Sequence, residues 1–414
     1  MSTLISAGEA CALLGVMRPT LYSYVSRGLL RALPGPDHRT HRYRRSEVER
    51  LAQRPLRRRA GKAASGALDF GPPLLESGLC LIERGHLYFR GVDAAALADG
   101  AGLEQVARLL WAAPDDPFAQ RAPSWPPPRR AAAAAGGDGM PLRRAQALFA
   151  LGAAANDDNP AALLREMAAC LLGVAPSAMP IHRQCARAWR LQPAGEALVR
   201  GALVLCADHE LNASGFAARV IASTGASLRE AVRGGLGALS GPRHGQMTAL
   251  VEQMWDELDA GAEPRALLAR RLEQHRAIPG FGHPLYPDGD PRARWILGRL
   301  PADGRREAVL AAALDLQGEA PALDFALVAL RRHLRLPAGG AFVLFCLGRC
   351  VGWIAHALEQ RPLGLIRPRA VYGGVRPPAV TDAGTAPGLA GAAGAPAAGP
   401  RPRRTGGRRS RSPA

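Results

Sequence analysis

The sequence predicts a mainly α-helical protein in which a large body follows a small, basic N-terminal unit. Apolar residues recur with helical spacing through most of the middle of the chain, and strand-like runs are few and short. Turn and capping signals divide the first fifty residues into short elements of their own. With 414 residues, 48% of them hydrophobic, the chain can form two or more domains around a large core.

The formal net charge of +18 is distributed unevenly. Residues 1–62 carry 13 basic and 4 acidic side chains (net +9), and residues 363–414 carry 9 basic and 1 acidic (net +8). The middle of the chain holds the other 31 basic and 30 acidic residues (net +1). A near-neutral body with two basic ends indicates that any polyanion is bound at the ends.

Compartment signals favour the cytoplasm. The N-terminus does not resemble a signal peptide, since Ser6 leads directly into an amphipathic helix. The longest apolar run, 341–354, is too short to span a membrane and contains Arg349. The seven cysteines are scattered without a C-x-x-C pair, which favours free thiols in a reducing compartment. We therefore expect a cytoplasmic protein with no membrane contact.

The sequence of residues 4–52 predicts, in order, a helix, a tight turn, a second helix, a two-stranded wing and a third helix. Ser6 and Glu9 form a capping box for the first helix, and Pro19 opens the second, over 20–27. Residues 29–45 have Pro-Gly-Pro at their centre, as a hairpin would, and a second capping box opens a helix through Gln53. This order resembles the winged helix-turn-helix domains of the mercury-resistance-regulator and excisionase type.

The resemblance implies that residues 1–62 bind duplex DNA. The residues expected to face the major groove are Arg18, Thr20, Tyr22, Ser23 and Tyr24. Those expected at phosphates, where they add affinity without reading sequence, are Arg39, Arg42 and Arg44. The alternative is a helical appendage whose basic face contacts only solvent.

Four residues of the body stand in settings that apolar packing does not explain. His209 lies in a polar island within an apolar helical run, and His244 lies in a turn broken by Gly and Pro on both sides. His283 lies in a Gly- and Pro-rich loop, and Asp324 stands alone among apolar neighbours. Each has a structural explanation by itself, such as a core histidine or a helix cap. Together they are candidates for acid–base chemistry.

Six ordered segments between Ala207 and Arg369 carry a resemblance to the citrate synthase family: ADHELNAS, GPRHG, GFGH…DPR, LDF, GR…GWIAH and RPR. No single segment is specific, but six in this order are. The resemblance implies the family's two-domain helical fold over 68–373, with a large domain at 68–243 and 338–373 and a small one at 244–337. Residues 82–91 resemble the strand pair of these enzymes. The Pro-, Gly- and Arg-rich tail, 375–414, is expected to be disordered.

The resemblance also implies residue roles. The catalytic residues would be His244 at the thioester oxygen, His283 at the keto oxygen and Asp324 as the base. The residues that bind the oxo acid would be His209, Arg292, Arg349 and Arg367. In the family the last of these comes from the other subunit, so a homodimer is expected. A structural salt bridge is the competing role for Arg292. The resemblance implies no metal or bound prosthetic group, and acyl-CoA enters as a substrate.

The expected reaction is the condensation of acetyl-CoA with oxaloacetate to citrate, as in the tricarboxylic acid cycle. Two alternatives stay open: 2-methylcitrate synthesis from propionyl-CoA, and a transcription regulator that senses these metabolites. One methylene in an acyl pocket is worth only about 1–3 kcal/mol. Gln246 and Met247 stand where the family has small residues, and Pro284 and Pro287 stand where it has basic ones. These departures put the acyl group and the binding of CoA in question.

Overall fold

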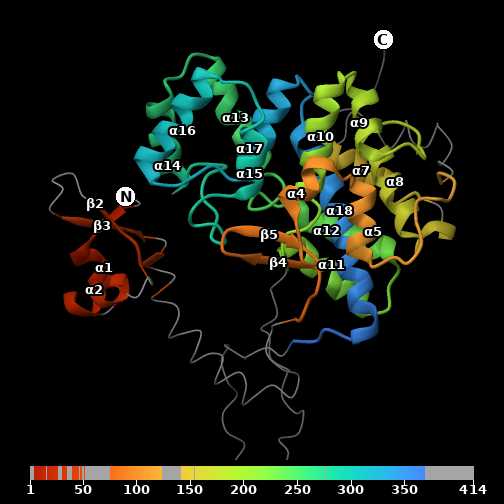
Figure 1. Cartoon of the computed structure of the whole chain (residues 1–414), viewed down its shortest axis with the longest axis horizontal. Helices are drawn as coiled ribbons and strands as arrows, with labels where there is room; N and C mark the ends of the chain where they lie inside the picture. The colour runs from red at the N-terminus through yellow and green to blue at the C-terminus, as the bar shows by residue number, and fades with distance from the viewer. Residues whose placement is uncertain are drawn as a thin grey trace, which may run out of the picture. The chain divides into compact units, whose positions relative to one another are not determined.

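The computed structural model describes residues 4–14, 16–26, 30–34, 40–45, 47–48, 51, 75–123, 141–152, 154–275 and 277–368 (Figure 1). The tail predicted to be disordered, 375–414, lies outside the described residues, as does most of the helix predicted through Gln53.

The N-terminal unit contains β1 (Leu4–Ser6), α1 (Ala7–Leu14), α2 (Arg18–Ser26), β2 (Ala32–Pro34) and β3 (His41–Arg44). The strands form an antiparallel sheet in the order β1-β3-β2, which confirms the predicted hairpin. The predicted capping box is also present: the Ser6 N–H donates to Glu9 Oε2 (2.8 Å) and the Glu9 N–H to Ser6 Oγ (3.3 Å). A small apolar core that includes Ile5, Leu21 and Tyr43 holds the unit together.

The described part of the body begins with a small antiparallel meander. It consists of β4 (Cys80–Glu83), β5 (His86–Phe89) and β6 (Val92–Asp93), in that order across the sheet. The two extended runs predicted about a turn are therefore present, and a short third strand follows them. Leu87 and Phe89 alternate inward along β5 and bury this sheet against the helices.

The rest of the body is helical, as predicted. Its α-helices and short 3-10 helices are α4 (Ala94–Gly100), α5 (Leu103–Trp111), α7 (Pro141–Phe149), η1 (Ala154–Asn156), α8 (Pro160–Leu172), α9 (Ile181–Trp189), α10 (Pro193–Leu205), α11 (Ala213–Ser223), α12 (Leu228–Leu239), α13 (Met247–Asp259), α14 (Pro264–His275), α15 (Pro291–Leu297), α16 (Gly304–Gln317), α17 (Leu323–His333), α18 (Gly340–Gln360) and η2 (Arg361–Leu363).

The long helix α18 forms the centre of the body. It packs against α5, α8, α10, α11, α12 and α17, and Figure 1 shows it, in blue, among these helices. A helix covered on all sides needs no polar face, which explains its almost continuous apolar sequence. Gly340–Leu363 has the length and the mean hydropathy, 1.7, of a membrane span, but 94% of its most apolar 18-residue stretch is buried inside the fold. It is the core helix of a globular body.

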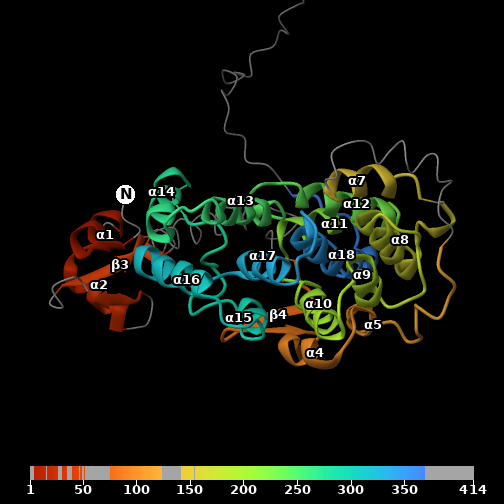
Figure 2. The same cartoon turned by 90° about the horizontal axis from the view of Figure 1, so that it is seen from above.

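Helices α13 to α17 form a second group beside α18. Within it α14 packs on α16, and α17 packs on both α13 and α15. Figures 1 and 2 show the group from two directions, and α17 also contacts α18. The chain enters this group through the 240–246 turn, and the 277–290 loop joins α14 to α15 within it; both segments carry predicted site residues.

Glycines in α18 allow this helix to touch the last turn of α10 and the backbone that follows it. A Cβ at Gly348 would lie 2.5 Å from both the Leu203 carbonyl oxygen and Cys206 Cβ. A Cβ at Gly352 would lie 2.5 Å from the Ala207 carbonyl oxygen. Backbone atoms at these distances cannot move aside, so only glycine permits the contact.

We expect Gly348→Ala to destabilise the body, because the added methyl overlaps backbone that cannot move away. Overpacking of this kind costs about 1–3 kcal/mol. Gly237→Ala is the matched control: Gly237 is exposed in α12, and a Cβ added there would meet nothing within 4 Å. Alanine at this position should stabilise the helix by up to about 1 kcal/mol. Thermal melting of both variants checks this, and equal melting temperatures would contradict the proposed contact.

Candidate active site

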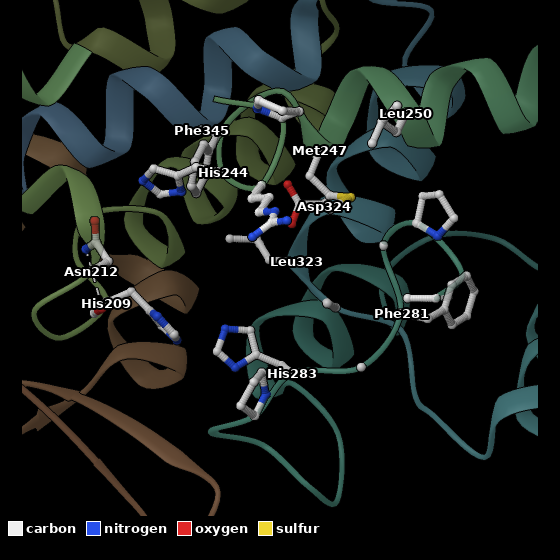
Figure 3. A pocket seen from close by; sticks show the side chains of 18 of the residues that line it. His209, Asn212, His244, Met247, Leu250, Phe281, His283, Leu323, Asp324 and Phe345 are labelled. Atoms are coloured by element: carbon white, nitrogen blue, oxygen red, sulfur yellow. Dashed lines mark hydrogen bonds between the residues drawn. The ribbon is translucent and has the colours of Figure 1, made fainter. Parts of the chain in front are cut away.

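A cavity of about 580 Å³ brings together six of the seven predicted catalytic and oxo-acid-binding residues. The members that line it are His209, His244, His283, Arg292, Asp324 and Arg349 (Figure 3). They come from segments spread over about 140 residues of sequence, so the tertiary fold assembles the site.

His209 lies in the segment between α10 and α11 and is 6% exposed. Its ring meets the His283 ring edge-on, with centroids 4.9 Å apart. Its Nε2 lies 3.0 Å from the hydroxyl of Tyr286. Burial, aided by the nearby charge of Arg292, lowers the pKa of His209 well below its ordinary value. The imidazole is therefore neutral at physiological pH.

His283 is held in one tautomer by its own loop. The Leu285 N–H donates to His283 Nδ1 over 3.2 Å, so the proton of the neutral ring is on Nε2. Burial lowers the pKa of His283 to about 4. Figure 3 shows the ring turned into the cavity. The residue is thus a neutral hydrogen-bond donor.

His244 sits in the turn between α12 and α13, with its ring edge-on to Phe345 at 5.8 Å. Burial lowers its pKa to about 4, so this histidine too is neutral. Its Nε2 lies 2.8 Å from Ser214 Oγ, which donates to Asn212 Oδ1 over 2.7 Å. The hydroxyl has one proton, so while it donates to Asn212 it can only accept from His244 Nε2. If the hydroxyl turns and donates to His244 Nε2 instead, the ring proton is on Nδ1.

Arg292 is fixed by Asp290, two residues earlier. Its Nε and Nη2 donate to the two carboxylate oxygens of Asp290 over 2.9 and 2.7 Å, and both residues are 3% exposed. Asp290 also accepts the backbone N–H of Leu323 (3.1 Å) and so ties the start of α15 to the start of α17. Arg292 therefore both forms a structural salt bridge and lines the cavity.

Arg349 is the second guanidinium at the cavity. It is 1% exposed, and its Nε donates to the Cys206 carbonyl oxygen over 3.0 Å. Within the described part of the chain no carboxylate pairs with it at ion-pair distance, in contrast to Arg292. A nearly buried guanidinium without a carboxylate beside an open cavity is suited to an anionic ligand.

Asp324 is the second residue of α17, and Figure 3 shows its carboxylate directed into the cavity. Burial in the surrounding protein raises its pKa to about 6, against the opposing effect of the positive charge of Arg292. The carboxylate is therefore more basic than an ordinary aspartate and still ionised at neutral pH.

One predicted site residue of the body lies outside the cavity. Arg367 is exposed after η2 and does not line the cavity of its own chain. His356 is a core residue, 1% exposed, with Nε2 3.2 Å from Asp208 Oδ1. Sequence reasoning did not single out the supporting residues Tyr286, Asp290, Ser214 and Asn212. All four lie within five residues of a predicted one.

The structure places the predicted DNA-binding residues on α2 and β3. Arg18, Thr20 and Tyr22 are exposed on α2, whereas Tyr24 is half-buried against the small core of the unit. Arg42 and Arg44 lie on β3. The side chain of Ser23, and Arg39 as a whole, lie outside the described residues.

In the described residues, no group of three or more His, Cys, Asp and Glu side chains is placed to hold a metal ion. All seven cysteines are free thiols. The groups of the cavity that can move protons or bind anions are its histidines, arginines and aspartate.

Comparison with known proteins bears on the cavity directly. The model of the family described as "Citrate synthase, C-terminal domain" matches residues 161–369, just over half of the chain and all six cavity residues. The chain belongs to the citrate synthase family. Residues 4–55 match a second model, "Helix-turn-helix domain". The predicted combination of a helix-turn-helix unit with a citrate-synthase body is thus confirmed.

Curated relatives are similar over part of their length. "Putative citrate synthase 2" of Mycobacterium tuberculosis is 40% identical over 187 residues, which are 42% of this chain and 50% of that protein. The 2-methylcitrate synthase of Shewanella oneidensis is 36% identical over 186 residues, with the same shares. The chain thus matches about half the length of these relatives.

Solved structures agree with the fold over a longer stretch. Citrate synthase from Thermotoga maritima superposes with a TM-score of 0.60 at 24% identity, covering 75% of this chain and 96% of that one. The enzyme from Thermoplasma acidophilum, solved with carboxymethyl coenzyme A and oxaloacetate, gives 0.60 at 20% identity, covering 77% and 98%. These likenesses confirm the citrate-synthase fold.

We expect His244 and His283 to remain neutral well below the ordinary pKa of histidine, because burial lowers both values to about 4. In ¹⁵N NMR of histidine-labelled protein at pH 6, both rings should give neutral signals, and His283 should carry its proton on Nε2. The exposed His86, which is 59% accessible at its side chain, gives the internal reference signal. An imidazolium signal from His283 at pH 6 would contradict the assignment.

Proposed function

We propose that this chain condenses acetyl-CoA with oxaloacetate to give citrate and CoA. The observation that carries the proposal is the makeup of one cavity: two neutral histidines, a carboxylate of raised pKa, and a guanidinium that pairs with no carboxylate of the described residues. Carbon–carbon bond formation from a thioester needs a base, donors for two developing oxyanions and cationic partners for the acceptor's carboxylates.

Oxaloacetate would bind through its two carboxylates. Arg349 offers a desolvated guanidinium, and Arg292, held by Asp290, adds positive charge beside it. His209 faces the same part of the cavity and completes the contacts of the oxo acid. We propose that Arg367 of the partner subunit supplies a further cation, in a homodimer with shared sites.

Enolisation of acetyl-CoA would begin at Asp324. Its carboxylate takes a proton from the carbon α to the thioester, helped by a pKa of about 6. Negative charge then develops on the thioester oxygen, where the Nδ1–H of His244 donates a hydrogen bond. This requires that the Ser214 hydroxyl turn from Asn212 Oδ1 and donate its proton to His244 Nε2, which the 2.8 Å contact permits.

Condensation would follow at the keto carbon of oxaloacetate. The enol carbon attacks it, a carbon–carbon bond forms, and the keto oxygen receives a proton from His283, whose Nε2–H faces the cavity. The product is the CoA thioester of citrate. Water then adds to the thioester carbon and the C–S bond breaks, which releases citrate and the thiol of CoA.

The alternative condensation, of propionyl-CoA with oxaloacetate, would give 2-methylcitrate by the same steps, and one curated relative is a 2-methylcitrate synthase. It is the competing activity and not a part of the proposal. The N-terminal unit would bind duplex DNA, supported by exposed Arg18, Thr20 and Tyr22 on α2 and by its net charge of +9. In that case the body would also serve as a sensor of its substrates.

We place the protein in the cytoplasm because its cysteines are free thiols. We assign 68–243 with 338–373 to a large domain and 244–337 to a small one.

Asp324→Asn should abolish release of CoA thiol from acetyl-CoA in the presence of oxaloacetate, because the amide cannot accept the α-proton. Oxaloacetate affinity should change little, since the base acts on the other substrate. A thiol-trapping assay and calorimetry measure the two. Asp315→Asn, which alters a 60% exposed side chain on α16, is the control and should leave the rate unchanged. More than a tenth of wild-type activity in Asp324→Asn, a loss below about 1.4 kcal/mol, would exclude it as the base.

The full-length protein should bind a duplex from its own upstream region, and affinity should fall steeply as salt rises, as phosphate-dominated binding does. Arg18→Ala should weaken this binding, while Arg183→Ala, at a 62% exposed arginine of the body, should not. Fluorescence anisotropy over a salt series checks both. Equal binding by a chain lacking residues 1–62 would assign the activity to the arginine-rich tail and contradict the role of the N-terminal unit.

A further inference from the structure

One side of the cavity is apolar. Met247, Leu250 and Phe281 line it, and Figure 3 shows them beyond Asp324 as seen from His209. The ionisable side chains stand on the other side. An oxo acid with two carboxylates belongs with the arginines and histidines. The apolar wall therefore faces the acyl-CoA.

Met247 is placed by the same turn that places His244. It is the first residue of α13, and its N–H donates to the His244 carbonyl oxygen over 2.9 Å. The side chain is partly buried, and Figure 3 shows it extending beside the carboxylate of Asp324. Helical side chains lean toward the N-terminus of their helix, which directs this one back over the cavity.

This position bears on the acyl group. The carboxylate of Asp324 must approach the α-carbon of the thioester to remove its proton, so the α-carbon lies beside the carboxylate. A β-carbon, present in propionyl and longer groups, would extend from the α-carbon into the neighbouring space. The Met247 side chain stands in that space.

We propose that Met247 is a specificity-determining residue that restricts the acyl-CoA substrate to the acetyl group, by filling the space beside Asp324 that a longer acyl chain would need. This inference rests on the proposed condensation and names its acyl substrate.

The other apolar residues of the wall are less suited to this role. The Phe281 ring packs on Phe325 with centroids 4.8 Å apart and is 6% exposed, so it belongs to the core. Leu250 is three residues further along α13, and Figure 3 shows it farther from the carboxylate than Met247. Methionine is unbranched and adaptable, and can fill a pocket without being locked into the core.

The test compares full-length wild type with Met247→Ala in thiol release from acetyl-CoA and propionyl-CoA, each with oxaloacetate. The ratio of kcat/KM for propionyl-CoA to that for acetyl-CoA should rise about tenfold or more in Met247→Ala, because one methylene is worth about 10–200-fold in such pockets. Met247→Leu, which conserves volume, should keep the wild-type ratio within about threefold. The KM for oxaloacetate should not change in either variant.

Gln246→Ala is the matched control. Gln246 is the neighbouring residue in the same turn, is exposed, makes no side-chain cap to α13 and does not line the cavity. Its substitution should leave the ratio within about twofold, which separates loss of the Met247 side chain from disturbance of the turn. An unchanged ratio in Met247→Ala, or a wild type that uses propionyl-CoA as well as acetyl-CoA, would overturn the inference.

A binding measurement separates failure of this inference from failure of the proposed function. Wild-type turnover of neither thioester would contradict the condensation itself. In the Asp324→Asn background, calorimetry with oxaloacetate present gives Kd for acetyl-CoA and propionyl-CoA without turnover. Adding Met247→Ala should improve the relative affinity for propionyl-CoA about tenfold, and no improvement would overturn the role of Met247 whatever the turnover result.

Discussion

The close contact of α18 with the backbone after α10 is the constraint on which the site depends. Gly348 and Gly352 leave no side chain between the helix and residues 203–208, so the two backbones touch. Arg349, between these glycines, donates to the Cys206 carbonyl oxygen and is directed toward the cavity. Because His209 follows directly on this segment, the same contact that buries the core helix positions two residues of the site. The contact between α18 and residues 203–208 therefore serves both the packing of the core and the geometry of the site.

The positions of Arg292 and of the helix that carries Asp324 depend on a single carboxylate, that of Asp290. Asp290 holds Arg292 with both oxygens and accepts the Leu323 N–H, so it fixes the helix that carries Asp324. A buried pair of this kind is costly to desolvate, and it persists only where every lone pair finds a donor. Here the donors come from two helices. Asp290 partly neutralises the charge of the Arg292 guanidinium, whereas the charge of Arg349 remains available to a ligand.

Neutral histidines follow from the same burial. His209, His244 and His283 are largely buried and lie near guanidinium groups, and both effects oppose protonation. The same desolvation acts in the opposite direction on Asp324 and makes it a stronger base. The same buried environment therefore keeps the histidines neutral, as hydrogen-bond donors, and makes Asp324 a proton acceptor at neutral pH. The Leu285 N–H sets the tautomer of His283, whereas the tautomer of His244 depends on whether the Ser214 hydroxyl donates to it or to Asn212 Oδ1.

The sequence by itself determined the helical class of the body, the hairpin and capping box of the N-terminal unit, and six residues that the fold brings to one cavity, out of the seven predicted for the site. Helical periodicity and glycine, proline and cap signals are local, so they can be read without a fold. The residues of the site could be named because ordered motifs carry them. Arg367 lies outside the cavity of its own chain, and its role across a dimer stays a prediction.

Only the tertiary structure decided how these residues act. Tyr286, Asp290 and Ser214 gave no separate signal, because a hydroxyl or carboxylate near a motif acquires meaning only when its partner from another segment is known. The lowered and raised pKa values depend on burial, which is a property of the folded chain. The place of Met247 beside Asp324 joins residues 77 positions apart in the sequence, and no local pattern records that they share a wall.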